Sequence, residues 1–373
     1  MKKKNLIIFG TRPEAIKMAP LVNQFLADQR FETKVCVTGQ HREMLDQVLS
    51  FFNITPDFDL SLMKPNQNLY DLTGEVISGL KPILDTFQPD FVYVHGDTTT
   101  TMAASIAGFY ARAKVCHVEA GLRTHNMLSP FPEEMNRQVA GRVATYHFAP
   151  TIKSQENLLK ENVSQENILV TGNTVIDALL ESSSRVKNLE NEDVADLKGI
   201  IDFNKKVVLV TGHRRENHGQ GFINICAALK EIAINNPDVE IVYPVHLNPN
   251  VLKPVNELLV DIINIHLVKP LSYPSFVWIM NQSYLIITDS GGVQEEAPSL
   301  GKPVLVMRDT TERPEAVEAG TVILVGTDTN KIIKETQELL DNSEKKYDSM
   351  SCLHNPYGDG KSCQRIIEFI SKL

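Results

Sequence analysis

The chain has 373 residues, of which 42% are hydrophobic and 22% charged, the proportions of a globular protein rather than a disordered or fibrous one. At roughly 150 residues per domain, this length predicts about two domains. The formal net charge of -9 argues against a nucleic-acid-binding protein, because such proteins present a basic surface to phosphates.

Five cysteines are scattered along the chain and none forms a CxxC pair. This usage argues against a disulfide framework or a zinc site and indicates a reducing compartment, so we expect a cytoplasmic protein without a bound metal. The apolar run over 5–9 is too short for the core of a signal peptide. Since no stretch approaches roughly 18 apolar residues, we expect no membrane span.

Short apolar runs rich in β-branched residues alternate with amphipathic segments. We predict strands over 6–9, 34–38, 91–95, 115–119, 146–149 and 168–170, and then over 206–211, 240–245, 263–267, 285–288, 303–307 and 322–325. The helices predicted between them include 15–30, 68–86 and 222–235. Continuous apolar strands that alternate with helices predict an α/β protein with parallel sheets covered on both faces.

The strand pattern restarts near residue 205, after a polar, charge-rich stretch over 182–204. We therefore expect an N-terminal α/β domain over 1–170 and a C-terminal domain over 171–360 that binds the nucleotide, with a last helix over 361–373 that packs back on the first. Two doubly wound sheets facing a central cleft form the GT-B arrangement. Because ligands of open parallel sheets bind beyond the carboxyl ends of the strands, polar residues just after each strand are the candidate site residues.

The segment 10–17 follows the first predicted strand. It is neither GxGxxG nor a P-loop, so it supports neither a dinucleotide site nor a Walker site. Pro13 suits the first turn of a helix, which puts Arg12 at the helix N-terminus and Lys17 about one turn on. Helix amides and a guanidinium can bind an anion. The alternative is a solvent-exposed Arg and Lys near a helix cap.

Three carboxylates lie near strand ends of the first half. Asp97 follows the strand 91–95, Glu119 closes the strand 115–119, and Glu133 stands four residues before Arg137. Taken singly, Asp97 could be a helix N-cap, and Glu133 and Arg137 could form a surface ion pair. Together, carboxylates in different environments can act as base and acid on opposite faces of a substrate.

His213 follows the first strand of the second half and stands beside two arginines, where it could meet a leaving phosphate. A lone histidine is more often structural. No second histidine lies at ligand spacing, so metal ligation is not expected.

The turn Ser290-Gly291-Gly292 follows the strand 285–288 and opens a helix. Without Cβ atoms, the turn lets a phosphate approach the free amides at the positive helix end. Glu296, about one turn further, could accept hydrogen bonds from ribose hydroxyls. The alternative is a plain tight turn.

Six motifs occur in order along the chain: Gly-Thr-Arg-Pro-Glu, His-Gly-Asp-Thr-Thr-Thr, His-Val-Glu-Ala-Gly-Leu-Arg-Thr, Phe-Pro-Glu-Glu-Met-Asn-Arg, Gly-His-Arg-Arg-Glu-Asn and Asp-Ser-Gly-Gly-Val-Gln-Glu-Glu-Ala. As a set they resemble the bacterial non-hydrolysing UDP-GlcNAc 2-epimerases. The resemblance implies the GT-B fold and reversible conversion of UDP-GlcNAc to UDP-ManNAc through 2-acetamidoglucal and UDP, which supplies ManNAc units for cell-surface polysaccharides. It implies no cofactor, in agreement with the missing GxGxxG.

The resemblance also implies residue roles. Asp97, Glu119 and Glu133 become acid/base candidates, and His213 lies near the leaving diphosphate. The phosphates would be bound by Arg12, Lys17, Arg137, Ser290, Gly291 and Gly292. The rest of the nucleotide would be bound by Glu296 at the ribose, Arg313, and Leu271 and Phe276 around the uracil.

The family has an effector site for UDP-GlcNAc, whose positions match Gln40, Gln67, Arg214 and His246. Glu43 and Asn66 depart from that pattern, since glutamine and arginine are usual there. Losing a cation and gaining a carboxylate should weaken diphosphate binding. We also expect a homodimer.

Three alternatives share this fold. A hydrolysing UDP-GlcNAc 2-epimerase would release ManNAc and UDP. A GT-B glycosyltransferase is permitted by the fold alone, but it would leave three acid candidates in one domain without a clear purpose. A binding-only sensor of sugar nucleotides would bind UDP without turnover.

Overall fold

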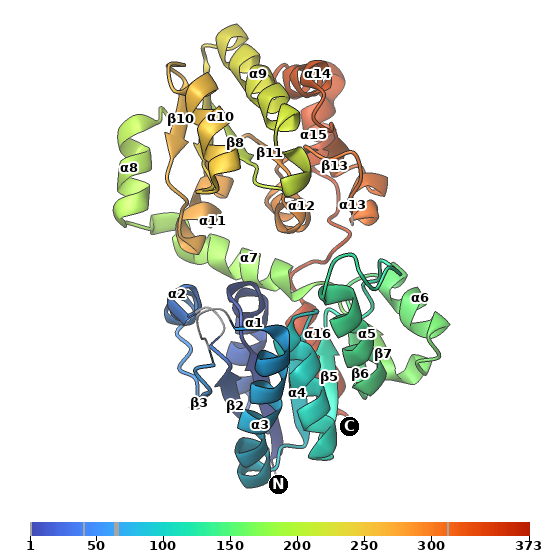
Figure 1. Cartoon of the computed structure of the whole chain (residues 1–373). Helices are drawn as coiled ribbons and strands as arrows, with labels where there is room; N and C mark the ends of the chain where they lie inside the picture. The colour runs from blue at the N-terminus through green and yellow to red at the C-terminus, as the bar shows by residue number, and fades with distance from the viewer. Residues whose placement is uncertain (1, 40–41, 63–66, 312) are drawn as a thin grey trace. The chain divides into compact units, whose positions relative to one another are not determined.

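The computed structural model describes residues 2–39, 42–62, 67–311 and 313–373. The chain forms two compact units (Figure 1): unit 1 comprises Met1–Ala178 and Tyr357–Leu373, and unit 2 comprises Leu179–Pro356. The first break falls inside helix α7 (Thr174–Arg185), which begins in unit 1 and ends in unit 2. The chain returns to unit 1 at Tyr357 and ends there with α16 (Ser362–Ser371).

Unit 1 contains a parallel sheet of seven strands within the described residues, in the order β3-β2-β1-β4-β5-β6-β7. The strands are β1 (Lys3–Phe9), β2 (Phe31–Val37), β3 (Phe58–Asp59), β4 (Phe91–His95), β5 (Lys114–Val118), β6 (Tyr146–Ala149) and β7 (Ile168–Val170). The predictions for 91–95, 146–149 and 168–170 are confirmed to the residue. The two-residue β3 was missed because it carries no run long enough to show a strand pattern.

The described helices of unit 1 are α1 (Arg12–Ala27), α2 (Arg42–Phe51), α3 (Leu69–Phe87), α4 (Thr99–Tyr110), α5 (Glu133–Val143), α6 (Ile152–Lys160) and α16. The last helix packs against α1. Its Phe369 ring lies edge-on to Tyr146, with ring centroids 5.4 Å apart, and to Phe148, at 5.9 Å. These contacts attach the C-terminus of the chain to β6.

Unit 2 repeats the plan with six parallel strands in its described part, in the order β10-β9-β8-β11-β12-β13. The strands are β8 (Lys206–Thr211), β9 (Val239–Pro244), β10 (Ile265–Val268), β11 (Leu285–Thr288), β12 (Val304–Val306) and β13 (Val322–Leu324). The helices after α7 are α8 (Glu192–Ile200), α9 (Gln220–Asn235), α10 (Pro249–Leu259), α11 (Tyr273–Gln282), α12 (Gly291–Glu296), α13 (Pro314–Glu318), α14 (Thr329–Leu340) and α15 (Lys346–Ser351).

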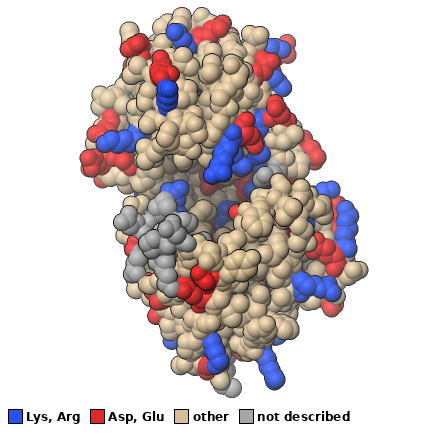
Figure 2. Space-filling model, in the orientation of Figure 1, with Lys and Arg blue, Asp and Glu red and all other residues tan. Residues whose placement is uncertain are grey.

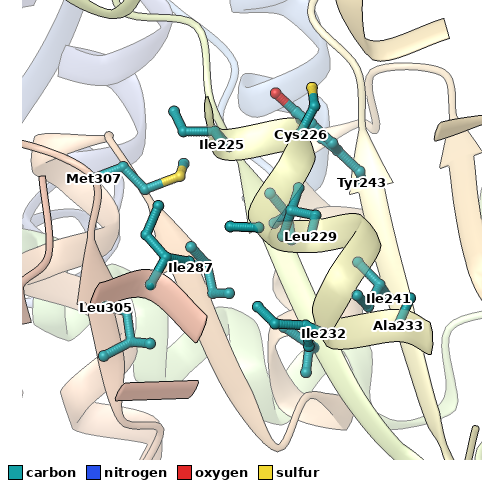
Figure 3. Packing of buried hydrophobic residues seen from close by; sticks show 14 of the residues in the cluster. Ile225, Cys226, Leu229, Ile232, Ala233, Ile241, Tyr243, Ile287, Leu305 and Met307 are labelled. Atoms are coloured by element: carbon teal, nitrogen blue, oxygen red, sulfur yellow. The ribbon is translucent and has the colours of Figure 1, made fainter. Parts of the chain in front are cut away.

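Helix α9 shows how the apolar pattern becomes a core. Ile225, Leu229 and Ile232 recur at helical spacing, so they form one stripe along the helix. All three are buried, and they belong to one cluster with Ile241 of β9 and Ile287 of β11 (Figure 3). Burying each such side chain contributes about 1.5–3 kcal/mol, so this stripe holds the helix on the sheet.

Both sheets are doubly wound, and this topology places the candidate sites. In each sheet the strand order reverses between two neighbours, β1 and β4 in unit 1 and β8 and β11 in unit 2. Ligands of such sheets bind at that switch point, outside the carboxyl ends of the strands. The prediction of two parallel, doubly wound sheets is confirmed.

The surface in Figure 2 carries lysine and arginine side chains interspersed with aspartate and glutamate on both units. Among the described residues, no helix has both the length and the apolar character needed to cross a membrane.

Candidate active site

Unit 1 has a pocket of about 380 Å³ at its switch point. Residues at or just after the ends of β1, β4 and β5 line it: Thr11, Arg12, Pro13, Glu14, Lys17, His95, Gly96, Asp97, Thr98 and Glu119. The topology therefore brings together two of the three predicted carboxylates, Asp97 and Glu119, with two of the predicted cations, Arg12 and Lys17.

A buried carboxylate, Glu14, organises the rim of this pocket. It accepts hydrogen bonds from the amides of Gly10 at 3.0 Å and Thr11 at 2.8 Å, and from the hydroxyl of Thr98 at 2.6 Å. Burial raises the pKa of Glu14, and these hydrogen bonds oppose the rise. Glu14 thus ties the loop after β1 to the loop after β4. Glu14 belongs to the motif Gly-Thr-Arg-Pro-Glu, but the sequence did not indicate its bond to the second loop.

The first turn of α1 is as predicted. Thr11 is the N-cap, Pro13 stands in the first turn, and Arg12 is the first helical residue, with its side chain exposed. Gly10 is required by close packing: a Cβ there would lie 2.1 Å from Thr38 Oγ1, which is shorter than any real contact.

Glu119 is a second buried carboxylate of the pocket, with 8% of its surface exposed. Its Oε1 accepts hydrogen bonds from Lys17 Nζ at 2.6 Å and from Asn173 Nδ2 at 2.9 Å. Its backbone is left-handed, with φ of 61°, a conformation that non-glycine residues adopt mainly where the surroundings enforce it. Lys17, expected to bind phosphate, here contacts Glu119.

His95 lies beside Glu119, with Nε2 3.4 Å from Oε2. Burial lowers the pKa of His95 to about 4; Glu119 opposes this shift and Lys17 adds to it. His95 is therefore neutral at pH 7 in spite of its carboxylate neighbour. Neither His95 nor Asn173 was among the predicted site residues, because each acquires its place only through the packing of strand ends.

Asp97 forms an ion pair with Arg137, and 30% of its side chain is exposed. Partial burial raises the pKa of Asp97, Arg137 and Lys17 oppose the rise, and the negative charges of Glu119 and Glu133 add to it. The N-cap of α4 is Thr98, so the alternative reading of Asp97 as a helix cap is wrong.

Glu133 is the first residue of α5 and is half-buried. Arg137 lies one turn further along the helix and contacts Glu134, Nη1 to Oε2 at 3.5 Å, as well as Asp97. Within the described residues it forms no ion pair with Glu133, so the simple surface pair suggested by the spacing is not present.

The switch point of unit 2 is built around Asp289, which follows β11 and is fully buried. Its Oδ2 accepts hydrogen bonds from the amides of His213 at 2.9 Å and Arg214 at 2.8 Å. A carboxylate at the end of one strand thereby shapes the turn after its neighbour. Asp289 was missed as a site residue, although its place directly after an apolar strand was a usable signal.

His213 presents its ring to solvent, with 45% of its side chain exposed. The ring stacks on His246, with centroids 5.5 Å apart and planes at 20°, and Nδ1 lies 3.5 Å from Asp289 Oδ1. Burial lowers the pKa of His213; Asp289 opposes the shift, whereas His246 and Arg214 add to it.

The turn after β11 has the predicted form. Ser290 is the N-cap of α12 but makes no side-chain capping bond, and Gly291 and Gly292 open the helix. A Cβ on Gly291 would lie 3.6 Å from Arg214 Nη2, so a guanidinium stands beside the turn. The prediction of a strand, a glycine turn and a helix is confirmed.

These strand-end motifs match a known family. A family model described as UDP-N-acetylglucosamine 2-epimerase matches residues 23–371. The chain belongs to the UDP-N-acetylglucosamine 2-epimerase family. It is 57% identical over 377 residues to the UDP-N-acetylglucosamine 2-epimerase of Campylobacter jejuni, a match that covers 100% of this chain and 98% of the relative.

Two solved structures extend the comparison. The Neisseria meningitidis UDP-GlcNAc 2-epimerase bound to UDP-GlcNAc has a TM-score of 0.88 and 51% identity, over 99% of this chain and 100% of that one. The Methanocaldococcus jannaschii enzyme in complex with UDP-GlcNAc and UDP has a TM-score of 0.80 and 33% identity, with the same coverage. The fold is therefore of the GT-B type.

The other nucleotide-site predictions for this epimerase-family chain fall in unit 2. Arg313 forms an ion pair with buried Glu295, and Glu296 ends α12. Leu271 lies just before α11, and Phe276 lies in its first turns, where its amide donates to Ser272 O at 2.8 Å.

The effector predictions are only partly within the described chain. Gln40 and Asn66 lie outside the described residues, as does the side chain of Glu43. Gln67 Nε2 donates to Glu75 Oε2 at 2.9 Å. Arg214 and His246 contact residues of the unit 2 switch point, as given above. Among the described residues no group of three or more His, Cys, Asp or Glu side chains is placed to hold a metal ion.

Proposed function

We propose that this protein interconverts UDP-GlcNAc and UDP-ManNAc by non-hydrolysing epimerisation at C2. The observation that carries the proposal is the pair of carboxylates, Asp97 and Glu119, in one pocket at a switch point. Each has a different cation beside it, Arg137 for Asp97 and Lys17 for Glu119. Family membership and relatives solved with UDP-GlcNAc bound support the same substrate.

The reaction has two stages. One carboxylate takes the C2 proton while the C1–O bond breaks and UDP leaves with the bonding electrons, which yields 2-acetamidoglucal. UDP oxygen then attacks C1 while another acid returns a proton to C2 from the opposite face. In the reverse direction the two carboxylates exchange roles as base and acid. Glu133 is a third candidate for either role. Positioned acids and bases of this kind contribute roughly 10²–10⁴-fold to a rate.

The UDP-binding part is assigned to unit 2. The amides of Ser290, Gly291 and Gly292 would bind the diphosphate, with His213 beside the leaving oxygen. Support for these two roles comes from the open glycine turn that begins α12 and from the exposed His213 ring. Glu296 would bind the ribose, Arg313 would complete the nucleotide pocket, and Leu271 and Phe276 would frame the uracil. Arg12, exposed at the start of α1, would bind phosphate from unit 1.

We further propose that UDP-GlcNAc activates the enzyme at an effector site that includes Gln40, Gln67, Arg214 and His246. Support comes from the stacking of His246 on His213 and from the relative solved with both UDP-GlcNAc and UDP. The active form is a homodimer, which sedimentation velocity would test. Its product, UDP-ManNAc, supplies ManNAc units for cell-surface polysaccharide synthesis.

One experiment tests the reaction type. UDP-GlcNAc is incubated with the protein in D₂O without nicotinamide and followed by NMR. We expect deuterium at C2 of both UDP-sugars, with the bond between sugar C1 and the UDP oxygen intact in each. Free ManNAc and UDP would indicate the hydrolysing reaction instead, and epimer with protium at C2 would overturn proton abstraction.

A further inference from the structure

Asn173 is a buried amide that faces the carboxylate of Glu119. It follows β7, which lies two strands away from β5, the strand that Glu119 follows. Only 2% of the surface of Asn173 is exposed. Its Nδ2 donates to Glu119 Oε1 at 2.9 Å, on the same oxygen that receives Lys17 Nζ at 2.6 Å. Two donors from different elements therefore converge on one carboxylate oxygen.

The orientation of this amide is determined by a second bond. Val175 N donates to Asn173 Oδ1 at 3.1 Å. Because the carbonyl oxygen of an amide only accepts and its nitrogen only donates, this bond turns Nδ2 toward Glu119. Asn173 is also held by its backbone, since its amide donates to Tyr357 O at 2.7 Å.

The partner of that backbone bond is the first residue of the returning C-terminal segment, Tyr357–Leu373. The segment contacts the turn 171–173 at two further points. Arg365 Nη1 donates to Thr171 O at 2.9 Å, and a Cβ on Gly172 would lie 2.8 Å from Ser362 Oγ.

Helix α7, which starts directly after Asn173, is fastened to the same segment. Asp177 accepts hydrogen bonds from the amides of Ser362 at 3.1 Å and Cys363 at 2.9 Å. The C-terminal segment is thus bonded to the turn before Asn173 and to the helix after it.

We propose that Asn173 is a positioning residue for Glu119 and that the C-terminal segment Tyr357–Leu373 holds it in place. The proposal rests on the proposed function in one respect, namely that Glu119 exchanges a proton with substrate. Lys17 supplies charge, but its four-carbon stem is flexible. The side chain of Asn173 is short, and hydrogen bonds hold both ends of its amide group. It therefore fixes the orientation of the Glu119 carboxylate.

The need for such a positioning residue follows from the backbone. Glu119 is in the left-handed region, which is unfavourable for a residue with a side chain unless its surroundings maintain it. With Oε1 held by two donors, the plane of the carboxylate is set and Oε2 turns toward His95 and Gly96. Both of these residues line the pocket, so the oxygen on their side is the one presented to substrate.

The test compares Asn173→Ala, Asn173→Asp and a matched control, Asn157→Ala. Asn157 is also buried, and its Nδ2 donates at 3.0 Å to Gly121 O, close to Glu119 in the chain but not to a carboxylate. The rate of deuterium entry at C2 is measured against pH, and UDP affinity is measured by calorimetry.

For Asn173→Ala we expect kcat to fall by about 100-fold, as is usual when a reacting group is displaced by about 1 Å, with UDP affinity unchanged. The acid limb of the pH–rate profile should move up by about one to two pH units, the size expected when a carboxylate loses a charged hydrogen bond. Asn173→Asp should move it further, because a second carboxylate replaces the donor. Asn157→Ala should lower the melting temperature and leave the acid limb in place.

An acid limb that stays at the wild-type pH in both Asn173 variants would overturn the positioning role. Should neither variant fold, Arg365→Ala decides, since its partly exposed guanidinium can be removed without opening the core. It should shift the limb in the same direction by a smaller amount, and an unshifted limb would overturn the role of the C-terminal segment. If the wild-type protein itself incorporates no deuterium at C2, the proposed function fails, irrespective of the variants.

Discussion

The two units share one topology but use their switch points differently. In unit 1 the strand ends direct ionisable side chains into a pocket, each with its own cation: Glu119 with Lys17, and Asp97 with Arg137. In unit 2 the buried carboxylate, Asp289, turns to backbone amides and shapes a turn. The comparison shows that a doubly wound sheet determines where a site lies, whereas the residues at its strand ends decide what chemistry is possible.

The largest effect is expected from amide variants in unit 1, which should lower turnover without changing UDP affinity. Asp97→Asn and Glu119→Gln keep the shape of each side chain but remove its proton acceptor, so turnover should fall by about 10²–10⁴-fold. UDP affinity should remain, because the nucleotide is assigned to unit 2. Deuterium entry at C2 and UDP calorimetry measure the two effects. Near-normal turnover in both variants would remove the acid/base assignment.

The converse change is made in unit 2. Gly291→Val places side-chain atoms over the open turn, so UDP affinity should fall by at least about 100-fold, the loss of roughly two charged hydrogen bonds. Ser290→Ala, a matched variant at the neighbouring position, should change affinity little, because Ser290 makes no side-chain capping bond. Equal and mild effects of the two substitutions would contradict phosphate binding at this turn.

Acid should unfold unit 1 before unit 2. Burial lowers the pKa of His117 to about 3 and those of His95 and His147 to about 4. These histidines are neutral when folded, and the unfolded chain binds more protons below about pH 6.5. The contribution of these neutral histidines to the stability of unit 1 is therefore fully present above about pH 6.5 and is lost as the pH falls toward 4. The loss is on the order of 3 kcal/mol for His95 alone.

The two units can be followed separately in that titration. The chain has one tryptophan, Trp278, which is buried in unit 2, so its fluorescence reports unit 2 while circular dichroism reports both units. Circular dichroism should change at a higher pH than the fluorescence does. His147→Gln, which carries no titrating ring, should lower the pH of the first transition. Coincident transitions would show that the histidines of unit 1 do not set its acid stability.

The smallest effect is expected at the effector site. Glu43 and Asn66 should weaken effector binding by at least about tenfold, the loss of one charged hydrogen bond, without abolishing it. Reverse epimerisation of pure UDP-ManNAc should then begin with a lag that traces of UDP-GlcNAc shorten. Arg214→Ala should lengthen the lag and spare UDP affinity, whereas Arg215→Ala, at the exposed neighbouring position, should change neither the lag nor UDP affinity. An immediate linear rate that added UDP-GlcNAc does not change would show that this chain lacks the regulation.

The sequence by itself determined all the described strands except β3, the parallel sheets and the strand ends at which to look. Continuous apolar runs such as 91–95 and 206–211 can be read one at a time, because a strand buried on both faces needs apolar residues throughout. Likewise, a turn such as Ser290-Gly291-Gly292 shows its open backbone in its composition.

Only the tertiary structure decided which groups meet. Arg137 was read against Glu133 on its own helix but pairs with Asp97, and Lys17 was assigned to phosphate but contacts Glu119. Asn173 and Asp289 received no site role until the strand ends were placed side by side. The physical reason is that hydrogen bonds and ion pairs depend on distances of about 3 Å, and partners from different strands or helices reach that distance only through packing, which no local sequence pattern records.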